Sequence, residues 1–225
     1  MNKPLFEFRG AAILFDMDGT LVDSMAHDER QWTRWAARYG LDPQPILKIS
    51  HGRRTEETIR EIAPHLATEE EFARFGDEEL SDREGIRAVA GAAALLSALP
   101  RDAWALVTSA PQKLAQMRME SAGLPLPSVV VSADDVKNGK PHPEGVLLAA
   151  RLLGVEPAEC LVIEDTPAGI QAARSGGMRA LGITTTYSCD QLGSEHCVRD
   201  FTAVRIVLDG CLHIVIPVIP ASNQG

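Results

Sequence analysis

Two carboxylates, two residues apart, follow an apolar segment near the start of the chain. Asp16 and Asp18 come directly after Ala12–Phe15, and Gly19 and Thr20 follow them. The apolar segment predicts a strand buried on both faces, and the glycine predicts the turn that ends it. Because ligands bind at the carboxyl ends of the strands in an open parallel sheet, the pair indicates chemistry on a phosphate group with Mg²⁺. Asp and Gly are also ordinary turn residues.

Two further strand ends carry groups that suit a phosphate. Thr108 and Ser109 end a second predicted strand, where hydroxyl and backbone N–H groups can bind phosphate oxygens. Ser109 could instead be only the N-cap of the next helix. Lys140 lies between Gly139 and Pro141, and the nearby prolines stiffen the backbone that aims the lysine. A lysine held in this way can neutralise a phosphoryl group, whereas most lysines of such loops are simply solvated.

A second carboxylate pair follows the predicted strand 160–163. Glu164 and Asp165 are adjacent, and like charges this close repel each other unless a cation or a proton lies between them. Oxygen ligands favour a hard ion such as Mg²⁺. Asp165 could instead be a helix N-cap, but that role does not explain why four strand ends carry complementary groups.

The remaining sequence predicts the elements that position these groups. Apolar residues recur at helical spacing over 28–39, 54–63 and 69–75, and no convincing strand occurs between residues 24 and 90. From Gly91 onward helices and strands alternate, which implies right-handed crossovers and a parallel sheet. The expected core elements are helices that end at Leu99 and Gly123, strands 104–108, 128–132, 160–163 and 179–184, and helices 144–153 and 167–175.

The expected architecture is an α/β fold with a Rossmann-like parallel sheet and an inserted, small, all-helical cap. The core comprises residues 1–23 and 91–225, and the cap of four or five helices comprises residues 24–90. The tail predicts a C-terminal β-hairpin, with strands 203–208 and 211–216 around a two-residue Asp209-Gly210 turn. We expect this hairpin to extend or cover an edge of the sheet.

Composition narrows the class of protein. The chain has 225 residues, 45% of them hydrophobic, and a formal net charge of −9. This charge argues against a nucleic-acid partner or an acidic membrane surface, which clustered Lys and Arg would bind. No apolar stretch approaches the roughly 20 residues that span a bilayer, and the first residues lack the apolar core of a signal peptide. We therefore expect a cytoplasmic protein without a membrane partner, and a monomer.

The cysteines and histidines form no recognisable metal site. The four cysteines show no CxxC spacing, so the sequence predicts neither a zinc site nor a disulfide framework. Cys160 heads a predicted strand, where a buried thiol acts as a small hydrophobic group. The remaining cysteines are Cys189, Cys197 and Cys211, and the ungrouped histidines are His27, His65, His142, His196 and His213.

The combination of motifs resembles a known family. In order and spacing, the motifs look like the four motifs of the haloacid dehalogenase superfamily of phosphohydrolases, and the resemblance covers nearly the whole chain. Segments 50–55 and 135–144 are similar to glycerol phosphatases, 2-deoxyglucose-6-phosphate phosphatases and bacterial sugar phosphatases. The four motifs are Asp16-Met17-Asp18-Gly19-Thr20, Thr108-Ser109, Lys140 and Glu164-Asp165.

The resemblance implies a mechanism. Asp16 is expected to be the nucleophile that forms an aspartyl phosphate, and Asp18 the general acid and base. Mg²⁺ is expected to bind a carboxylate oxygen of Asp16, the backbone carbonyl of Asp18, and Asp165, while Glu164 is a ligand or orients the metal's waters. The residues expected to bind phosphate are Gly19, Thr108, Ser109 and Lys140.

Substrate choice is expected to depend on the cap. His51, Arg53 and Arg54 flank Gly52 and could face the site, with Arg54 favoured as a substrate contact because its position matches the phosphatases named above. The arginines could instead be solvated residues at a helix start. The expected substrate is a small sugar or polyol phosphate monoester. The alternatives are a β-phosphoglucomutase-like mutase and a non-catalytic metabolite-binding module.

Overall fold

The computed structural model of the chain describes residues 5–208, 212–217 and 219–220. Its main sheet has seven strands, of which six are parallel and the edge strand β12 is antiparallel. Strand β2 lies between β7 and β5, so the segment after it leaves the middle of the sheet. In spatial order the strands are β12 (Ile219–Pro220), β9 (His196–Val198), β8 (Arg179–Ile183), β7 (Cys160–Glu164), β2 (Ala12–Phe15), β5 (Trp104–Val107) and β6 (Val129–Val131).

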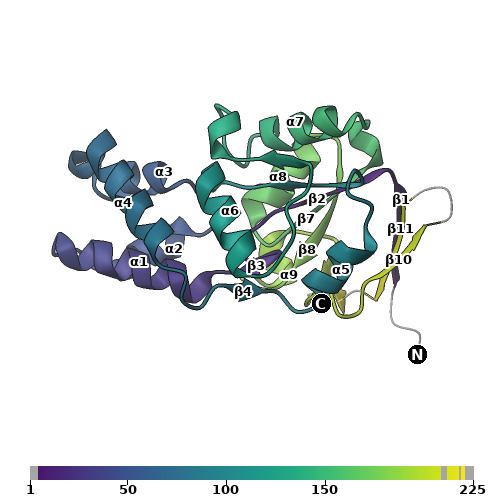
Figure 1. The fold of residues 1–225 in the computed structure, drawn as a ribbon, viewed down its shortest axis with the longest axis horizontal. Coiled ribbons are helices and arrows are strands. Elements are labelled where there is room, and N and C mark those ends of the chain that lie inside the picture. Colours follow the sequence, from purple (N-terminus) through teal and green to yellow (C-terminus); the bar gives the residue numbers. More distant parts are fainter. Residues whose placement is uncertain (1–4, 209–211, 218, 221–225) are drawn as a thin grey trace.

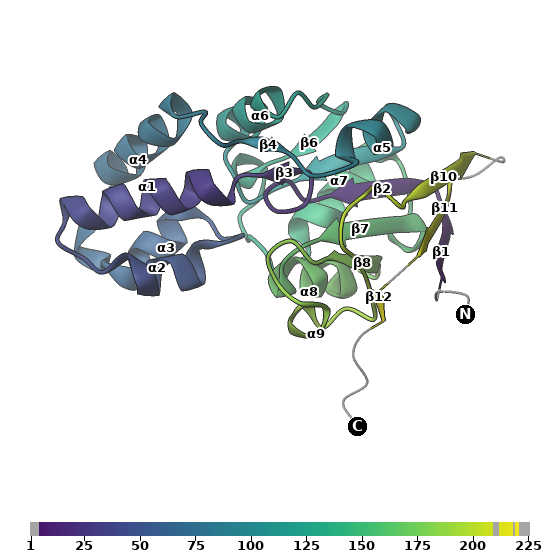
Figure 2. The same cartoon turned by 90° about the horizontal axis from the view of Figure 1, so that it is seen from below.

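Helices cover both faces of this sheet, as Figure 2 shows. Ile13 and Phe15 pack in one cluster with side chains of α5 and α6, whereas Ala12 and Leu14 pack on the other face with side chains of α7. All four residues of β2 are fully buried, which confirms the predicted strand. The core helices are α5 (Ala92–Ala98), α6 (Gln112–Ser121), α7 (Glu144–Leu153), α8 (Pro167–Ser175) and α9 (Cys189–Leu192). The described residues also form three short 3₁₀ helices, which are Pro64–Leu66 between α3 (Thr55–Ile62) and α4 (Glu69–Ser81), Ala133–Asp135, and Pro157–Glu159.

Four helices gather at one end of the molecule, on the left of Figure 1. We call α1 to α4 the helical end. It has its own buried cluster, which includes Trp32, Trp35 and Phe75. The indole N–H of Trp35 also donates to Glu71 Oε1 at 2.9 Å. These helices are α1 (Met25–Arg38), α2 (Pro43–Ser50), α3 (Thr55–Ile62) and α4 (Glu69–Ser81).

The two connections between the helical end and the core run side by side. Strand β3 (Val22–Asp23) pairs antiparallel with β4 (Arg87–Ala88). The expectation that residues 24–90 contain no strand was therefore wrong at β4. A strand of two residues is too short to show a period in the sequence.

A second, three-stranded sheet lies at the opposite end of the molecule from the helical end (Figure 1). Strands β10 (Arg205–Leu208) and β11 (Leu212–Pro217) form the expected antiparallel hairpin, whereas its Asp209-Gly210 turn lies outside the described residues. The hairpin does not extend the main sheet, because β11 pairs with β1 (Leu5–Gly10). In β1, Phe6 and Phe8 are buried whereas Glu7 and Arg9 are exposed, which is the alternation of a half-buried strand.

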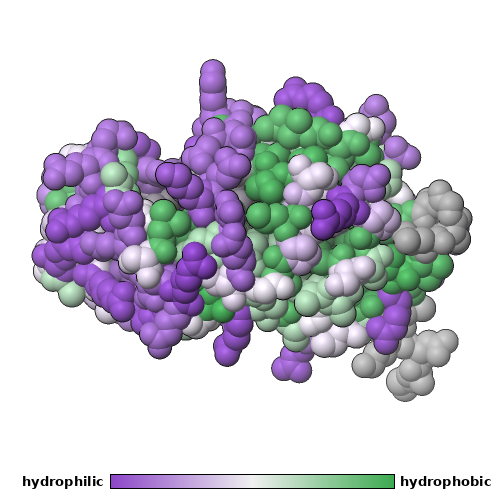
Figure 3. All heavy atoms as spheres, viewed as in Figure 1, coloured by the Kyte–Doolittle hydropathy of each residue, from purple (hydrophilic) through white to green (hydrophobic). Residues whose placement is uncertain are grey.

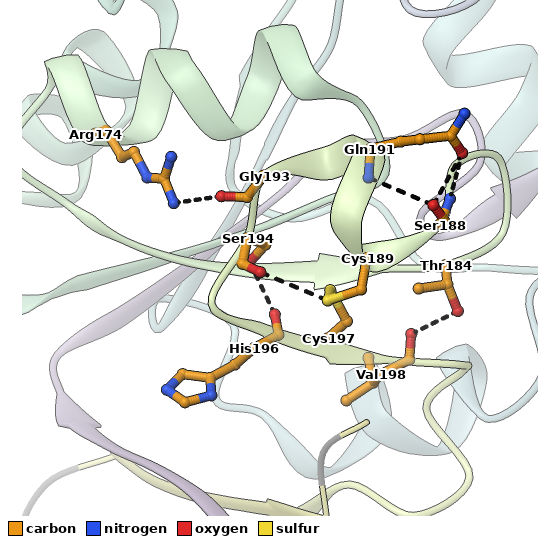
Figure 4. The surroundings of a disulfide bond; sticks show 10 residues. All are labelled: Arg174, Thr184, Ser188, Cys189, Gln191, Gly193, Ser194, His196, Cys197 and Val198. Carbon is orange, nitrogen blue, oxygen red and sulfur yellow. Dashed lines mark hydrogen bonds between the residues drawn. A yellow bond between two sulfur atoms is a disulfide. The ribbon is translucent and has the colours of Figure 1, made fainter. Parts of the chain in front are cut away.

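A disulfide between Cys189 and Cys197 corrects the expectation that the cysteines form none. Gly193, in the left-handed region, reverses the chain between α9 and β9 and brings the two Cα atoms to 5.9 Å. The carbonyl of Gly193 accepts a hydrogen bond from Arg174 at 2.6 Å (Figure 4). Cys160 is buried with a free thiol, as expected.

Removing this disulfide should lower the free energy of unfolding. A crosslink between residues eight apart reduces the entropy of the unfolded chain, so we expect the Cys189→Ala/Cys197→Ala double variant to lose about 2 to 3 kcal/mol. Urea unfolding without reductant measures the difference. A reductant should destabilise the wild type and leave the double variant unchanged, and equal sensitivity of both proteins would contradict the assignment.

Hydrophilic side chains gather over α1 and α4 on the face shown in Figure 3. Across the described ranges, we find no helix with the length and apolar character that crossing a membrane requires. Trp32, Trp35, Ile46, Ile59 and Phe75 of the helical end instead pack in its own buried cluster.

Candidate active site

Three carboxylates meet where β2 and β7 end. The strands are parallel neighbours, with Phe15 opposite Ile163, and the amide of Asp16 donates to the carbonyl of Ile163 at 3.0 Å. This register places Asp16 beside Glu164 and Asp165, and one oxygen from each lies within 4.8 Å of the others. All three are buried, so their charges need a cation nearby. The donor set contains only oxygen, which fits a hard divalent ion.

Two glycines leave room for these carboxylates. Gly19 has a φ of +79°, and a Cβ built on it would lie 2.0 Å from Asp165 Oδ2. A Cβ on Gly169, in the first turn of α8, would lie 1.8 Å from Glu164 Oε1. Larger residues at these two positions would collide with the carboxylates.

Lys140 forms ion pairs with two of the three carboxylates. Its Nζ contacts Asp16 Oδ1 and lies 2.5 Å from Glu164 Oε1. The loop that carries it is fixed by Glu144, whose carboxylate accepts the backbone N–H groups of Lys137 and Asn138 at 3.0 and 3.1 Å. Burial opposes the charge of Lys140, but Asp16 and Glu164 outweigh it and raise the pKa of the ammonium. The lysine is therefore a permanent positive charge beside Asp16.

Asp16 lies in a strongly negative environment. Burial raises its pKa well above the usual value, Lys140 opposes this shift, and Glu164 and Asp165 add to it. A further positive charge next to Asp16 would therefore favour the ionised form that a nucleophile needs.

Glu164 and Asp165 have different partners. Glu164 Oε2 accepts from the backbone and hydroxyl of Thr166 at 2.7 and 2.8 Å. Thr166 is also the N-cap of α8, which excludes the N-cap alternative for Asp165. Asp165 Oδ2 accepts from Thr186 Oγ1 at 2.6 Å and lies 2.9 Å from His51 Nε2.

Thr108 and Ser109 follow β5 and line a cavity together with Asp16 and Asp18. They also line a second cavity that includes Lys140. Thr108 Oγ1 accepts the amide of Ala110 at 3.0 Å, which orders the turn after the strand. Ser109 does not cap the next helix, because α6 begins after Pro111.

Asp18 points to partners other than the three carboxylates. Its Oδ1 accepts from Ser24 Oγ at 2.7 Å, and its Oδ2 lies 2.7 Å from Arg118 Nη1. Burial raises the pKa of Asp18 and outweighs the opposing effect of Arg118. The two aspartates of the first motif therefore have separate surroundings, which is the arrangement that divides roles between two acids.

Comparison with known proteins identifies the family. A family model described as haloacid dehalogenase-like hydrolase matches residues 11–177. The chain belongs to the haloacid dehalogenase-like hydrolases. This identification confirms the resemblance found in the motifs, and the matched range includes Asp16, Ser109, Lys140 and Asp165.

Individual relatives agree with the family. Hexitol phosphatase A of Escherichia coli is 42% identical over 84% of this chain and 90% of its own length. 2-Deoxyglucose-6-phosphate phosphatase 1 of Saccharomyces cerevisiae is 35% identical over 94% of this chain and 96% of its own. The crystal structure of a hydrolase from Pseudomonas syringae superposes with a TM-score of 0.71, at 26% identity, over 82% of this chain and 89% of that one. The parallel α/β fold predicted from the sequence is thereby confirmed.

This hydrolase has a buried charge cluster that the sequence did not reveal. Arg118 of α6 is only 4% exposed, and besides Asp18 it contacts two carboxylates of the helical end. Its Nη2 donates to Asp28 Oδ1 of α1 and lies 3.3 Å from Glu79 Oε1 of α4. Burial raises the pKa of Glu79 to about 8 despite the opposing charge of Arg118. The cluster therefore links the helical end directly to Asp18.

The three candidate cap residues of the hydrolase lie in different surroundings. His51 contacts Asp165, as described above, and although burial opposes its charge, Asp165 raises its pKa to about 9. Arg53 lines the cavity of Asp16 and Asp18 and pairs with Glu61 at 2.8 Å. Arg54 lines the cavity of Lys140, and its guanidinium donates to the backbone carbonyls of residues 136 and 137 at 2.9 and 3.3 Å. Substrate contact by these residues stays a prediction.

Proposed function

We propose that this hydrolase cleaves small sugar or polyol phosphate monoesters through an aspartyl phosphate on Asp16. The observation that carries the proposal is the contact of the buried Asp16 carboxylate with Lys140, at the end of the central strand and beside Asp165. Two relatives support the substrate class, because one is named hexitol phosphatase A and the other 2-deoxyglucose-6-phosphate phosphatase 1.

Asp16 and Asp18 have different roles in the two chemical steps. A carboxylate oxygen of Asp16 attacks phosphorus, and the bond from phosphorus to the ester oxygen breaks as Asp18 transfers its proton to that oxygen. Asp18 then takes a proton from the water that attacks the aspartyl phosphate, which releases inorganic phosphate, frees the Asp16 carboxylate and leaves Asp18 protonated again. The raised pKa of Asp18 supports its starting role as an acid.

The polar groups around Asp16 hold the phosphoryl group. Lys140 neutralises charge on the phosphoryl oxygens, and Thr108, Ser109 and the backbone after Gly19 supply hydrogen-bond donors. Glu164 keeps Lys140 in place, since its carboxylate is itself fixed by Thr166. We place Glu164 in this supporting role.

A divalent cation, which we propose to be Mg²⁺, fits the buried carboxylate group. Asp16 and Asp165 would hold it, with the backbone carbonyl of Asp18, because these are hard oxygen donors. When bound, Mg²⁺ stabilises negative charge on the phosphoryl oxygens. Lys140 and His51 provide at most two positive charges for the three carboxylates, so negative charge remains for a dication to balance once a phosphate binds.

Phosphate release from a panel of esters tests the proposal. We expect release from hexitol 6-phosphates, 2-deoxyglucose 6-phosphate or glycerol phosphate in the presence of Mg²⁺. A hexose 1-phosphate distinguishes the mutase, because a mutase would convert it to the 6-phosphate, whereas a phosphatase yields only free sugar and phosphate. Binding without any turnover across the panel would favour the metabolite-binding module.

Three expectations from the sequence stay predictions. They are the cytoplasmic location, the monomeric state, and the division into a core of residues 1–23 and 91–225 and a cap of residues 24–90.

A further inference from the structure

The active-site cavity is lined jointly by the core and by the helical end. Asp28 of α1 and Glu79 of α4 line it together with Asp16, Asp18 and Arg118. Asp28 and Glu79 reach Asp18 through one guanidinium group, because Arg118 contacts all three carboxylates. Under the proposed function Asp18 must touch the ester oxygen, so the carbon chain of the leaving group has to lie next to this cluster.

The charges around this part of the cavity are unevenly distributed. Arg118 is one positive charge against Asp18, Asp28 and Glu79. The other arginine that lines the cavity, Arg53, is already paired with Glu61. Arg118 is itself balanced by the Asp28 carboxylate that it contacts. The side chains that line this cavity therefore offer no uncompensated cation beyond the phosphoryl site.

We propose that Asp28 and Glu79, held in place by Arg118, bind hydroxyl groups of the leaving group and exclude substrates that carry a second anionic group there. This inference rests on the proposed function and specifies its substrates. Carboxylate and carboxyl oxygens accept hydrogen bonds from hydroxyls, and bonds to an ionised acceptor are the stronger ones. A second carboxylate or phosphate would instead be buried against like charge without a counter-ion.

The same arrangement separates a phosphatase from a mutase. A mutase must hold a bisphosphorylated sugar, because it returns the phosphoryl group to a sugar monophosphate. The second phosphate of such an intermediate would have to lie near Asp28 and Glu79, and this cluster gives it no free positive charge. The hydrolase is thus expected to release its neutral, hydroxylated product rather than rephosphorylate it.

A matched pair of substrates tests this inference. Glucitol 6-phosphate and 6-phosphogluconate differ only at the end remote from the phosphate, where one has a hydroxymethyl group and the other a carboxylate. We expect kcat/KM for the wild type to be at least about 100-fold higher with glucitol 6-phosphate. Acetyl phosphate, which has no hydroxyl groups, serves as the minimal substrate.

Two variants separate the effect of charge from that of hydrogen bonding. Asp28→Asn removes the charge, so the ratio of kcat/KM for glucitol 6-phosphate to kcat/KM for 6-phosphogluconate should fall at least about tenfold from its wild-type value. Glu79→Met removes the hydrogen-bonding group, so kcat/KM for glucitol 6-phosphate should fall about tenfold further than for acetyl phosphate. Asp77→Asn, an exposed acid on the same helix as Glu79, is the matched control and should change neither value.

The outcomes distinguish this inference from the proposed function. Equal wild-type turnover of glucitol 6-phosphate and 6-phosphogluconate would overturn the inference alone. The inference would also be overturned if Asp28→Asn kept the wild-type ratio of kcat/KM between the two hexose-derived substrates and Glu79→Met lowered kcat/KM equally for all substrates. An absence of turnover with every substrate, acetyl phosphate included, would overturn the proposed function and this inference with it.

Discussion

Replacement of Asp16 by Asn is expected to lower kcat by about 10⁴-fold or more while the fold is kept. The amide cannot attack phosphorus to form the phosphoenzyme, so this route to product is lost rather than slowed. Steady-state phosphate release from the preferred sugar or polyol phosphate measures the effect. The remaining side chains still bind the phosphoryl group, so KM should change far less than kcat.

The same variant should remain folded. Asn has nearly the size of Asp, and burial of the ionised carboxylate is unfavourable, as the raised pKa of Asp16 shows. Lys140 keeps its second partner, Glu164, at 2.5 Å. We therefore expect the unfolding temperature to fall by no more than about 4 °C. Calorimetry on both proteins separates loss of the nucleophile from loss of structure.

Asp18→Asn provides the matched control for the chemical role. With p-nitrophenyl phosphate the leaving group needs no proton, so this variant should still form the phosphoenzyme but hydrolyse it slowly. A burst of one nitrophenolate per enzyme is expected in Asp18→Asn, and no burst in Asp16→Asn. Residual turnover above one per cent in Asp16→Asn, or a burst in both variants, would remove Asp16 as the nucleophile.

The parts of the site that were predictable from the sequence lie at the ends of buried strands. Asp16 and Asp165 follow continuous apolar runs, and such runs indicate central strands of a parallel sheet. Because the carboxyl ends of neighbouring parallel strands share one edge, residues about 150 positions apart could be placed together before the structure was known. Helices 144–153 and 167–175 were predicted with their observed bounds for a similar reason, since an apolar period and a proline or glycine define their ends.

The cluster around Arg118 could not be placed in this way. Asp28, Glu79 and Arg118 belong to three helices, and contacts between helices depend on packing angles that no short motif encodes. One signal was present, because Arg118 lies between Met117 and Met119 in a helix that packs on the sheet. A charge at such a position has to be paired. Its partners, however, were indistinguishable from the other acidic residues of α1 and α4.

Pairings over long sequence distances account for the remaining differences. Phe6 and Phe8 alternate with polar residues, so β1 was detectable, but nothing in this alternation names β11 as its partner. The disulfide depends on a chain reversal at Gly193 that brings two cysteines eight residues apart together. Spacing alone fits a disulfide no better than it fits two free thiols.

Removal of divalent metal is expected to have an effect as large as that of Asp16→Asn. Asp16, Glu164 and Asp165 are buried within 4.8 Å of one another, and the incoming phosphate adds further negative charge. Without a dication, the described residues that form ion pairs with these carboxylates are Lys140 and His51. We expect EDTA to reduce phosphate release to below about one per cent, and added Mg²⁺ to restore it fully. Thermal unfolding should independently show a rise in melting temperature with Mg²⁺ concentration, since the ion binds only the folded site.

Asp165→Asn identifies the carboxylates as the site of this metal effect. Asp165 is fully buried, and its loss should weaken Mg²⁺ binding at least about tenfold, both in the concentration that restores activity and in the melting shift. Asp102→Asn, at an exposed position of the core, should respond to Mg²⁺ as the wild type does. Activity that survives EDTA would contradict the metal site, and so would an equal melting shift in Asp165→Asn and wild type. In that case Lys140 and His51 would have to balance the carboxylates without a metal ion.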